Sequence, residues 1–135
     1  MFGRRDLLRA VAVGSVALAG CSGGSSTDPP EGTDIAAAPG GSPVFDPDAL
    51  TVSVGDTVTW FFAESSHNVS CVPADSSQCS LPEGAEPFAS YETDKYDTEP
   101  SGATYEHTFE TAGEYHYVCI PHASVGMVGT ITVEK

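Results

Sequence analysis

The chain has 135 residues, which is enough for one domain of modest size. It carries nineteen acidic and five basic residues, a net charge of −14. A surface this acidic excludes binding to nucleic acid through the phosphates, because such binding requires a basic face. The charge fits either a protein built for very salty water or an ordinary acidic protein outside the cytoplasm, and it does not choose between them.

The first residues are typical of an export signal. Arg4 and Arg5 precede an apolar run that is too short to span a bilayer comfortably. The paired arginines resemble a twin-arginine signal, which exports folded proteins, and residues 18–21 resemble the lipobox of secreted lipoproteins. We therefore expect a signal peptide over residues 1–20 and a lipid on Cys21; the alternative is a cytoplasmic amphipathic helix.

Residues 21–41 are rich in Gly, Ser and Pro and are expected to form a flexible linker. A lipid on Cys21 would then hold the domain at the extracytoplasmic face of the cell membrane as a peripheral protein. Loss of the signal peptide leaves Lys95 and Lys135 against eighteen acidic residues, a net charge of −16.

Residues 42–135 are predicted to form one all-β domain. Short segments of alternating or β-branched and aromatic residues, separated by turns, are typical of a β-sandwich. Residues 72–102 look irregular, although 87–91 fit either a short strand or a helical turn. The predicted strands are 50–54, 57–62, 104–109, 114–119 and 127–133.

A group of metal-binding side chains stands out near the C-terminus. Cys119, His122 and Met127 fall within nine residues between two predicted strands, and His67 lies in another loop. One Cys, two His and one weakly binding Met are the ligands of a blue-copper electron-transfer site. His107 and His116 lie within predicted strands, so we expect them at the surface and not on the metal.

The segments around these residues resemble the plastocyanin family of cupredoxins. The resemblance is strongest to halocyanins, the small blue-copper lipoproteins of salt-loving archaea. It covers nearly all of residues 42–135 apart from the irregular part, and rests on residues 44–47, 50–60, 67–69, 111–115, 119–122 and 126–131.

The resemblance implies a cupredoxin-type Greek-key β-sandwich that binds one type 1 copper through His67, Cys119, His122 and Met127. It also implies that Asn68 hydrogen-bonds to the loop that carries Cys119. Many plastocyanins have an aromatic residue directly before the ligand Cys, and here that position is Val118. We therefore expect electrons to pass through the exposed edge of His122.

Two cysteines remain once Cys21 is assigned to a lipid and Cys119 to copper. Cys71 and Cys79 lie close in sequence, and an oxidising compartment favours a disulfide between them. Such a disulfide would stabilise the fold by about 2.5 kcal/mol. Two free thiols are the alternative.

These features predict an electron carrier that acts with redox proteins of a membrane electron-transport chain, and we expect a monomer. An enzyme such as a copper oxidase or nitrite reductase would need additional copper sites with further His clusters, which this sequence lacks. The other alternative is a copper-delivery or structural cupredoxin domain without redox work.

Overall fold

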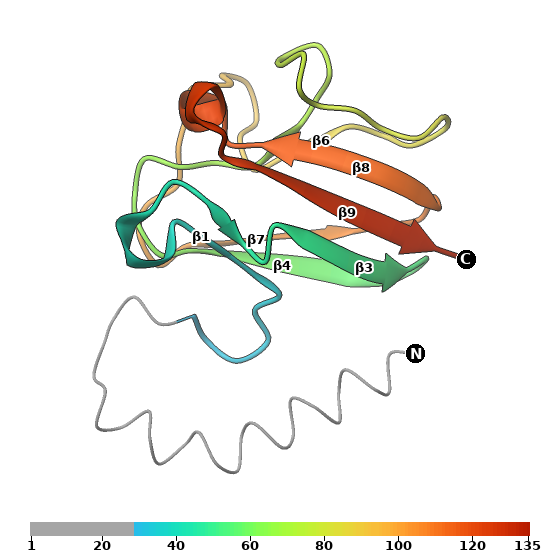
Figure 1. Cartoon of the computed structure of the whole chain (residues 1–135), viewed down its shortest axis with the longest axis horizontal. Coiled ribbons are helices and arrows are strands. Elements are labelled where there is room, and N and C mark those ends of the chain that lie inside the picture. The colour runs from blue at the N-terminus through green and yellow to red at the C-terminus, as the bar shows by residue number, and fades with distance from the viewer. Residues whose placement is uncertain (1–28) are drawn as a thin grey trace.

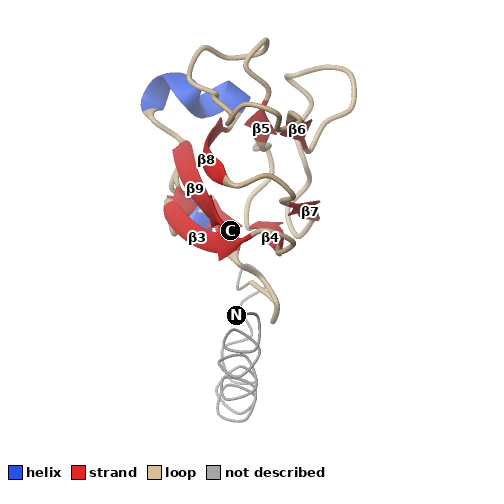
Figure 2. Cartoon of the chain, turned by 90° about the vertical axis from the view of Figure 1, so that its right-hand side faces the viewer, coloured by secondary structure: helices blue, strands red, loops and turns tan. Residues whose placement is uncertain are grey.

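The computed structural model describes residues 29–135, which fold into two facing β-sheets (Figures 1 and 2). One sheet has the order β2-β1-β4-β7 and the other has the order β3-β9-β8-β5-β6. The chain crosses between the sheets after β2, β3, β4, β6 and β7, so the predicted all-β sandwich is confirmed. The strand bounds are β1 Ile35–Ala37, β2 Phe45–Asp46, β3 Ala49–Ser53, β4 Thr57–Phe62, β5 Ser70–Cys71, β6 Phe88–Ala89, β7 Thr104–Thr108, β8 Gly113–Val118 and β9 Val128–Glu134.

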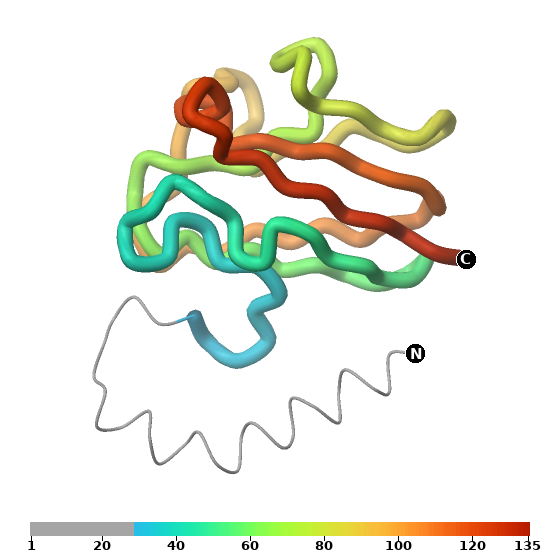
Figure 3. Tube along the Cα trace, in the orientation of Figure 1, coloured from blue at the N-terminus to red at the C-terminus, as the bar shows by residue number. Residues whose placement is uncertain are grey.

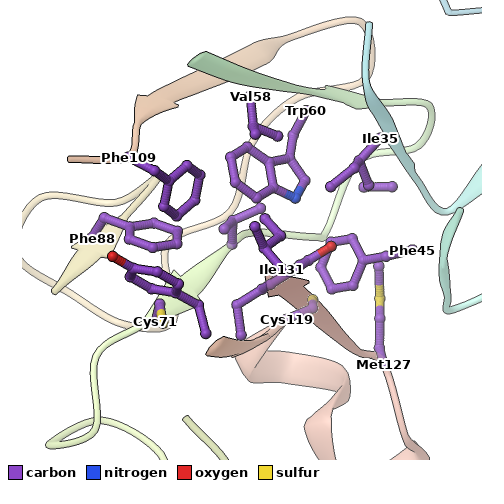
Figure 4. Close-up of a cluster of buried hydrophobic side chains, with 14 of the residues drawn as sticks. Ile35, Phe45, Val58, Trp60, Cys71, Phe88, Phe109, Cys119, Met127 and Ile131 are labelled. Carbon is purple, nitrogen blue, oxygen red and sulfur yellow. The ribbon is translucent and has the colours of Figure 1, made fainter. Parts of the chain in front are cut away.

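Aromatic side chains fill the space between the sheets (Figure 4). Tyr115 and Tyr117 point inward from β8, while His116 between them points outward, as the two-residue period of a strand requires. Trp60 from β4 is fully buried and packs edge-on against Tyr117 at a ring distance of 5.4 Å. Side chains from both sheets therefore meet in one core.

The folded domain begins earlier than the sequence suggested. Ile35–Ala37 forms β1, which pairs parallel to β4 and antiparallel to β2, and Ile35 is buried. The prediction that the linker extends to residue 41 is therefore wrong: a short apolar run inside a Gly- and Pro-rich stretch joins the sheet. The predicted signal peptide and Cys21 lie outside the described residues.

The other predicted strands correspond to β3, β4, β7, β8 and β9, and residues 87–91 contain the short strand β6. Between β4 and β6, only Ser70–Cys71 forms a strand, β5, and the loop before it carries His67. Within residues 29–135, no helix has both the length and the apolar character needed to cross a membrane.

Candidate metal centre

The loop from β8 to β9 brings three of the predicted ligands together. Cys119 follows β8 directly, and the 3-10 helix Ile120–Val125 comes next, with Pro121 in its first turn and Gly126 as its C-cap. Gly126 has φ 92°, a left-handed conformation that suits glycine. The Cys119 N–H donates to the Met127 carbonyl at 3.0 Å, which closes the loop. This turn lies at the same end of the sandwich as the connection after β4, as the red and green parts of Figure 3 show.

His67 lies in the loop between β4 and β5. Its side chain is only 6% exposed, and its ring stacks on that of His122 with the ring centres 4.4 Å apart. The Glu99 N–H donates to the His67 carbonyl at 2.9 Å. The two imidazoles are thus held face to face by different loops.

The donor atoms of Cys119, His67 and His122 form a compact group. The Cys119 Sγ lies 3.7 Å from His67 Nδ1 and 3.4 Å from His122 Nδ1. A sulfur at about 2.3 Å and a nitrogen at about 2.0 Å from one tetrahedral metal ion lie roughly 3.5–3.8 Å apart. The three ligand atoms all lie within 4.8 Å of one another, so the group fits a single metal ion.

Met127 completes the set. Its side chain is fully buried, and it lies beside Phe45 on the side of the core that holds Cys119 (Figure 4). Three strong ligands with one buried thioether match the donor set of a type 1 copper site, in which the thioether would be the weak ligand. The four ligands predicted from the sequence are therefore placed together.

Burial sets the protonation of the site. It raises the pKa of the Cys119 thiol, although the N–H groups of Asn68 and His122 oppose part of that rise. A metal ion must therefore displace a proton to bind the thiolate. Burial also lowers the pKa of His67, with a further contribution from His122, while Glu64 opposes the shift. The lowered pKa favours the neutral form of His67, the form in which a histidine binds a metal.

Asn68 joins three parts of the chain. Its backbone N–H points at the Cys119 Sγ at 3.5 Å, and its Oδ1 accepts from the Ile120 N–H at 2.9 Å. This is the link to the Cys119 loop that the resemblance implied. Its Nδ2 donates to the carbonyls of Lys95 at 3.0 Å and Asp97 at 2.8 Å. These two bonds could not be predicted from the sequence, because the acceptors are backbone atoms of the irregular segment.

The predicted disulfide is absent from the structure. Cys71 and Cys79 are free, buried thiols. The Cys71 thiol lies 3.2 Å from the His116 carbonyl oxygen, whereas the Cys79 thiol lies 3.2 Å from that of Ser70. Burial raises the pKa of both thiols, that of Cys71 to about 12. The two sulfurs therefore contact carbonyl groups and form no bond with each other.

The two remaining histidines lie apart from this group. His116 is partly exposed and its Nδ1 is 3.2 Å from the Thr130 hydroxyl. His107 is more covered than we expected for a surface residue, because its ring stacks on Phe88 at 4.1 Å. Among residues 29–135, the His, Cys, Asp and Glu side chains that could hold a metal ion gather only at His67, Cys119 and His122.

Comparisons with known proteins agree with this geometry. The family model for copper binding proteins of the plastocyanin/azurin family matches residues 34–134. A plastocyanin from Scenedesmus fuscus is 40% identical over 95 residues, which are 70% of this chain and 90% of that protein. A halocyanin from Natronomonas pharaonis is 38% identical over 92 residues, which are 67% of this chain and 48% of the halocyanin.

Solved structures show the same fold. A pseudoazurin from Methylobacterium extorquens AM1 has a TM-score of 0.56 and 25% identity, covering 76% of this chain and 75% of the pseudoazurin. A plastocyanin from Dryopteris crassirhizoma has a TM-score of 0.51 and 27% identity, covering 70% and 91% of the two chains. The fold, the ligand set and these relatives together show that the chain belongs to the plastocyanin/azurin family of copper-binding proteins.

Proposed function

We propose that this protein is an electron carrier with one type 1 copper bound by His67, Cys119, His122 and Met127. The observation that carries the proposal is the close grouping of the three strong donor atoms, all within 4.8 Å, beside a fully buried Met127. When bound, copper would supply a one-electron couple between Cu(I) and Cu(II). The protein supplies all four ligands, which leaves no position for a substrate and argues against an enzyme.

The scaffold holds these ligands with little freedom to move. Cys119 and Met127 are fully buried and His67 nearly so, and the backbone bond from Cys119 to Met127 ties the ends of the loop. A site that keeps its shape when the charge of the metal changes transfers electrons quickly, because few atoms must rearrange.

Electrons would enter and leave at His122. His122 is the only partly exposed member of the three-residue group, and Val125 in the same short helix is 65% exposed. Val128, just beyond Met127, is 37% exposed. We define Pro121, Val125 and Val128 as the apolar rim around His122. At molar salt the Debye length is about 3 Å, so a redox partner would dock through this rim and gain little from the acidic charge.

We further propose that the domain acts at a membrane. Cleavage after residue 20 and lipidation of Cys21 would tether it to the extracytoplasmic face, with redox proteins of a membrane electron-transport chain as partners. The lipobox-like residues 18–21 and the Gly- and Ser-rich residues that follow support this proposal. Replacing Cys21→Ser should release the protein from the membrane fraction of a suitable exporting host; continued membrane association of the variant would oppose the proposal.

Electron exchange between the oxidised and reduced protein tests the carrier function. We expect NMR line broadening in mixtures of the two forms at molar salt to report rapid exchange. Val125→Glu should slow that exchange and leave the visible spectrum unchanged. Val54→Glu is the matched control, because Val54 is 41% exposed in the turn between β3 and β4, at the other end of the sandwich.

Two results would count against this function. Equal effects of the two valine substitutions on the rate of electron exchange would show that the apolar rim is not the docking surface. A protein that exchanges electrons slowly but gives its Cu(I) readily to a chelator would fit the alternative, a copper-delivery domain.

A further inference from the structure

The second half of the irregular segment lies along the residues that lead from His67 into β5. We call residues 88–99 the bracing segment. It contacts each residue from 67 to 71 in turn. Hydrogen bonds join Glu99 to His67, Lys95 and Asp97 to Asn68, Ser90 to Val69, and Tyr91 to Ser70. In the strand pairing of β5 with β6, Ala89 lies opposite Ser70 and Phe88 lies opposite Cys71.

On its other side, the same stretch faces the strand that leads to Cys119. β5 pairs with β8 through Ser70 and Val118 alone. Beyond that pair, the Cys71 thiol lies 3.2 Å from the His116 carbonyl oxygen of β8, and Asn68 makes the connection nearer the ligands, through its N–H to the Cys119 Sγ and its Oδ1 to the Ile120 N–H. The position of His67 relative to Cys119 therefore depends strongly on how Asn68 is oriented.

The bracing segment fixes that orientation. A carboxamide can rotate to exchange its oxygen and nitrogen, but here the nitrogen donates to two carbonyls, of Lys95 and Asp97. These bonds leave Oδ1 facing Ile120. Asn68 is fully buried, so breaking this arrangement would leave polar atoms without partners.

The side chains of Ser90 and Tyr91 anchor the bracing segment. The Ser90 Oγ accepts from the Val69 N–H at 3.0 Å, and the Tyr91 hydroxyl lies 2.7 Å from the Ser70 Oγ. The Tyr91 hydroxyl also donates to the Asp75 carboxylate. These contacts join the segment to Val69, Ser70 and Asp75, none of which is a predicted ligand.

We propose that the bracing segment is a positioning element of the copper site. It holds His67 and Asn68 in the metal-binding arrangement before copper binds. Ser90 and Tyr91 are its positioning residues and act through Asn68. The proposal rests on the copper-carrier function above and adds a role for a segment that supplies no ligand. Substitutions at Ser90 and Tyr91 should therefore change the copper site from a distance.

The test uses the full chain with the double substitution Ser90→Ala and Tyr91→Phe. Amide hydrogen exchange is measured by NMR on the metal-free protein and on the diamagnetic Cu(I) form. Loss of the three hydrogen bonds that the Ser90 and Tyr91 hydroxyls make with Val69, Ser70 and Asp75 should speed exchange of the Ile120 and Glu99 amides by about ten-fold or more in the metal-free protein. In the Cu(II) form, the electron paramagnetic resonance spectrum should differ from that of the wild type.

Two controls separate positioning from general loss of stability. Tyr96→Phe makes the same chemical change within the bracing segment, at a ring that is 64% exposed, and should have no effect. Ser90→Thr keeps the hydroxyl, so as a single substitution it should leave both amide protection and the spectrum as they are in the wild type.

Unchanged exchange at Ile120 and Glu99 in the double variant would overturn the proposal. Equal acceleration throughout β3 and β9 would also overturn it, since that result reports global destabilisation. An unaltered Cu(II) spectrum despite faster exchange would show that the bracing segment does not position the ligands. Failure of the wild-type chain to bind copper would instead refute the carrier function, and the metal-free measurements would still stand.

Discussion

Adding one methyl group at Gly129 should destabilise the domain through a single contact. Gly129 in β9 lies directly opposite Tyr117 in β8, and the tyrosine ring lies across it. A Cβ at position 129 would lie 2.7 Å from Tyr117 Cε1 and closer still to its Cζ and Oη. Tyr117 cannot easily move away, because it is fully buried between Trp60 and Phe45, with the Phe45 ring centre 4.7 Å away.

Overpacking of this kind costs about 1–3 kcal/mol. We therefore expect Gly129→Ala to lower the free energy of unfolding by that amount and the melting temperature by about 4–8 °C per kcal/mol. Urea unfolding of the metal-free protein measures the change. Trp60, the single tryptophan, lies beside Tyr117 and provides the fluorescence signal.

A double-mutant cycle assigns the loss to the ring. Tyr117→Leu removes the Cε1, Cζ and Oη atoms that the new methyl group would meet. Gly129→Ala should then cost much less in the Tyr117→Leu background than in the wild type, with a coupling energy of about 1 kcal/mol or more. An equal cost in both backgrounds, or no cost in the wild type, would refute the reasoning.

Two further substitutions test the core and the metal site. Burial lowers the pKa of His107, although Glu86 opposes part of that shift. Protonation of His107 therefore favours the unfolded chain. The free energy of unfolding should decrease as the pH falls from about 6.5 toward the lowered pKa of the folded protein. Urea unfolding at about pH 7.5 and 5 should show a smaller pH dependence for His107→Phe than for the wild type, and an unchanged dependence would contradict this assignment. Met127→Leu keeps the side-chain volume and should change stability by less than about 1.5 kcal/mol. It should retain the blue colour but raise the reduction potential in voltammetry, because Cu(II) loses a donor; an unaltered potential would mean that the thioether does not bind.

The sequence was enough to predict the metal ligands because their chemistry is concentrated in one short loop. Cys119, His122 and Met127 are near neighbours in the chain, and the two flanking strands had clear alternating patterns. His67 could be added because a β-sandwich brings its loops together at each end. The residue types themselves then indicate which metal binds, because one Cys, two His and one Met are the ligand set of type 1 copper.

Features that depend on backbone partners could not be predicted in the same way. β1 is three residues long and owes its stability to pairing with β2 and β4, which local sequence does not reveal. The bracing segment meets Asn68 through carbonyl groups, so its side chains do not identify the contact. A disulfide between Cys71 and Cys79 is predicted by elimination alone, whereas in the structure the two free thiols contact different carbonyls.

Addition of Cu(II) to the purified, metal-free chain tests the central claim most directly. We expect one copper per chain and an intense blue absorption from thiolate-to-copper charge transfer, lost in Cys119→Ser and retained in Cys71→Ser. A colourless complex, or a blue colour that survives Cys119→Ser, would contradict the assignment of a type 1 copper site to this protein.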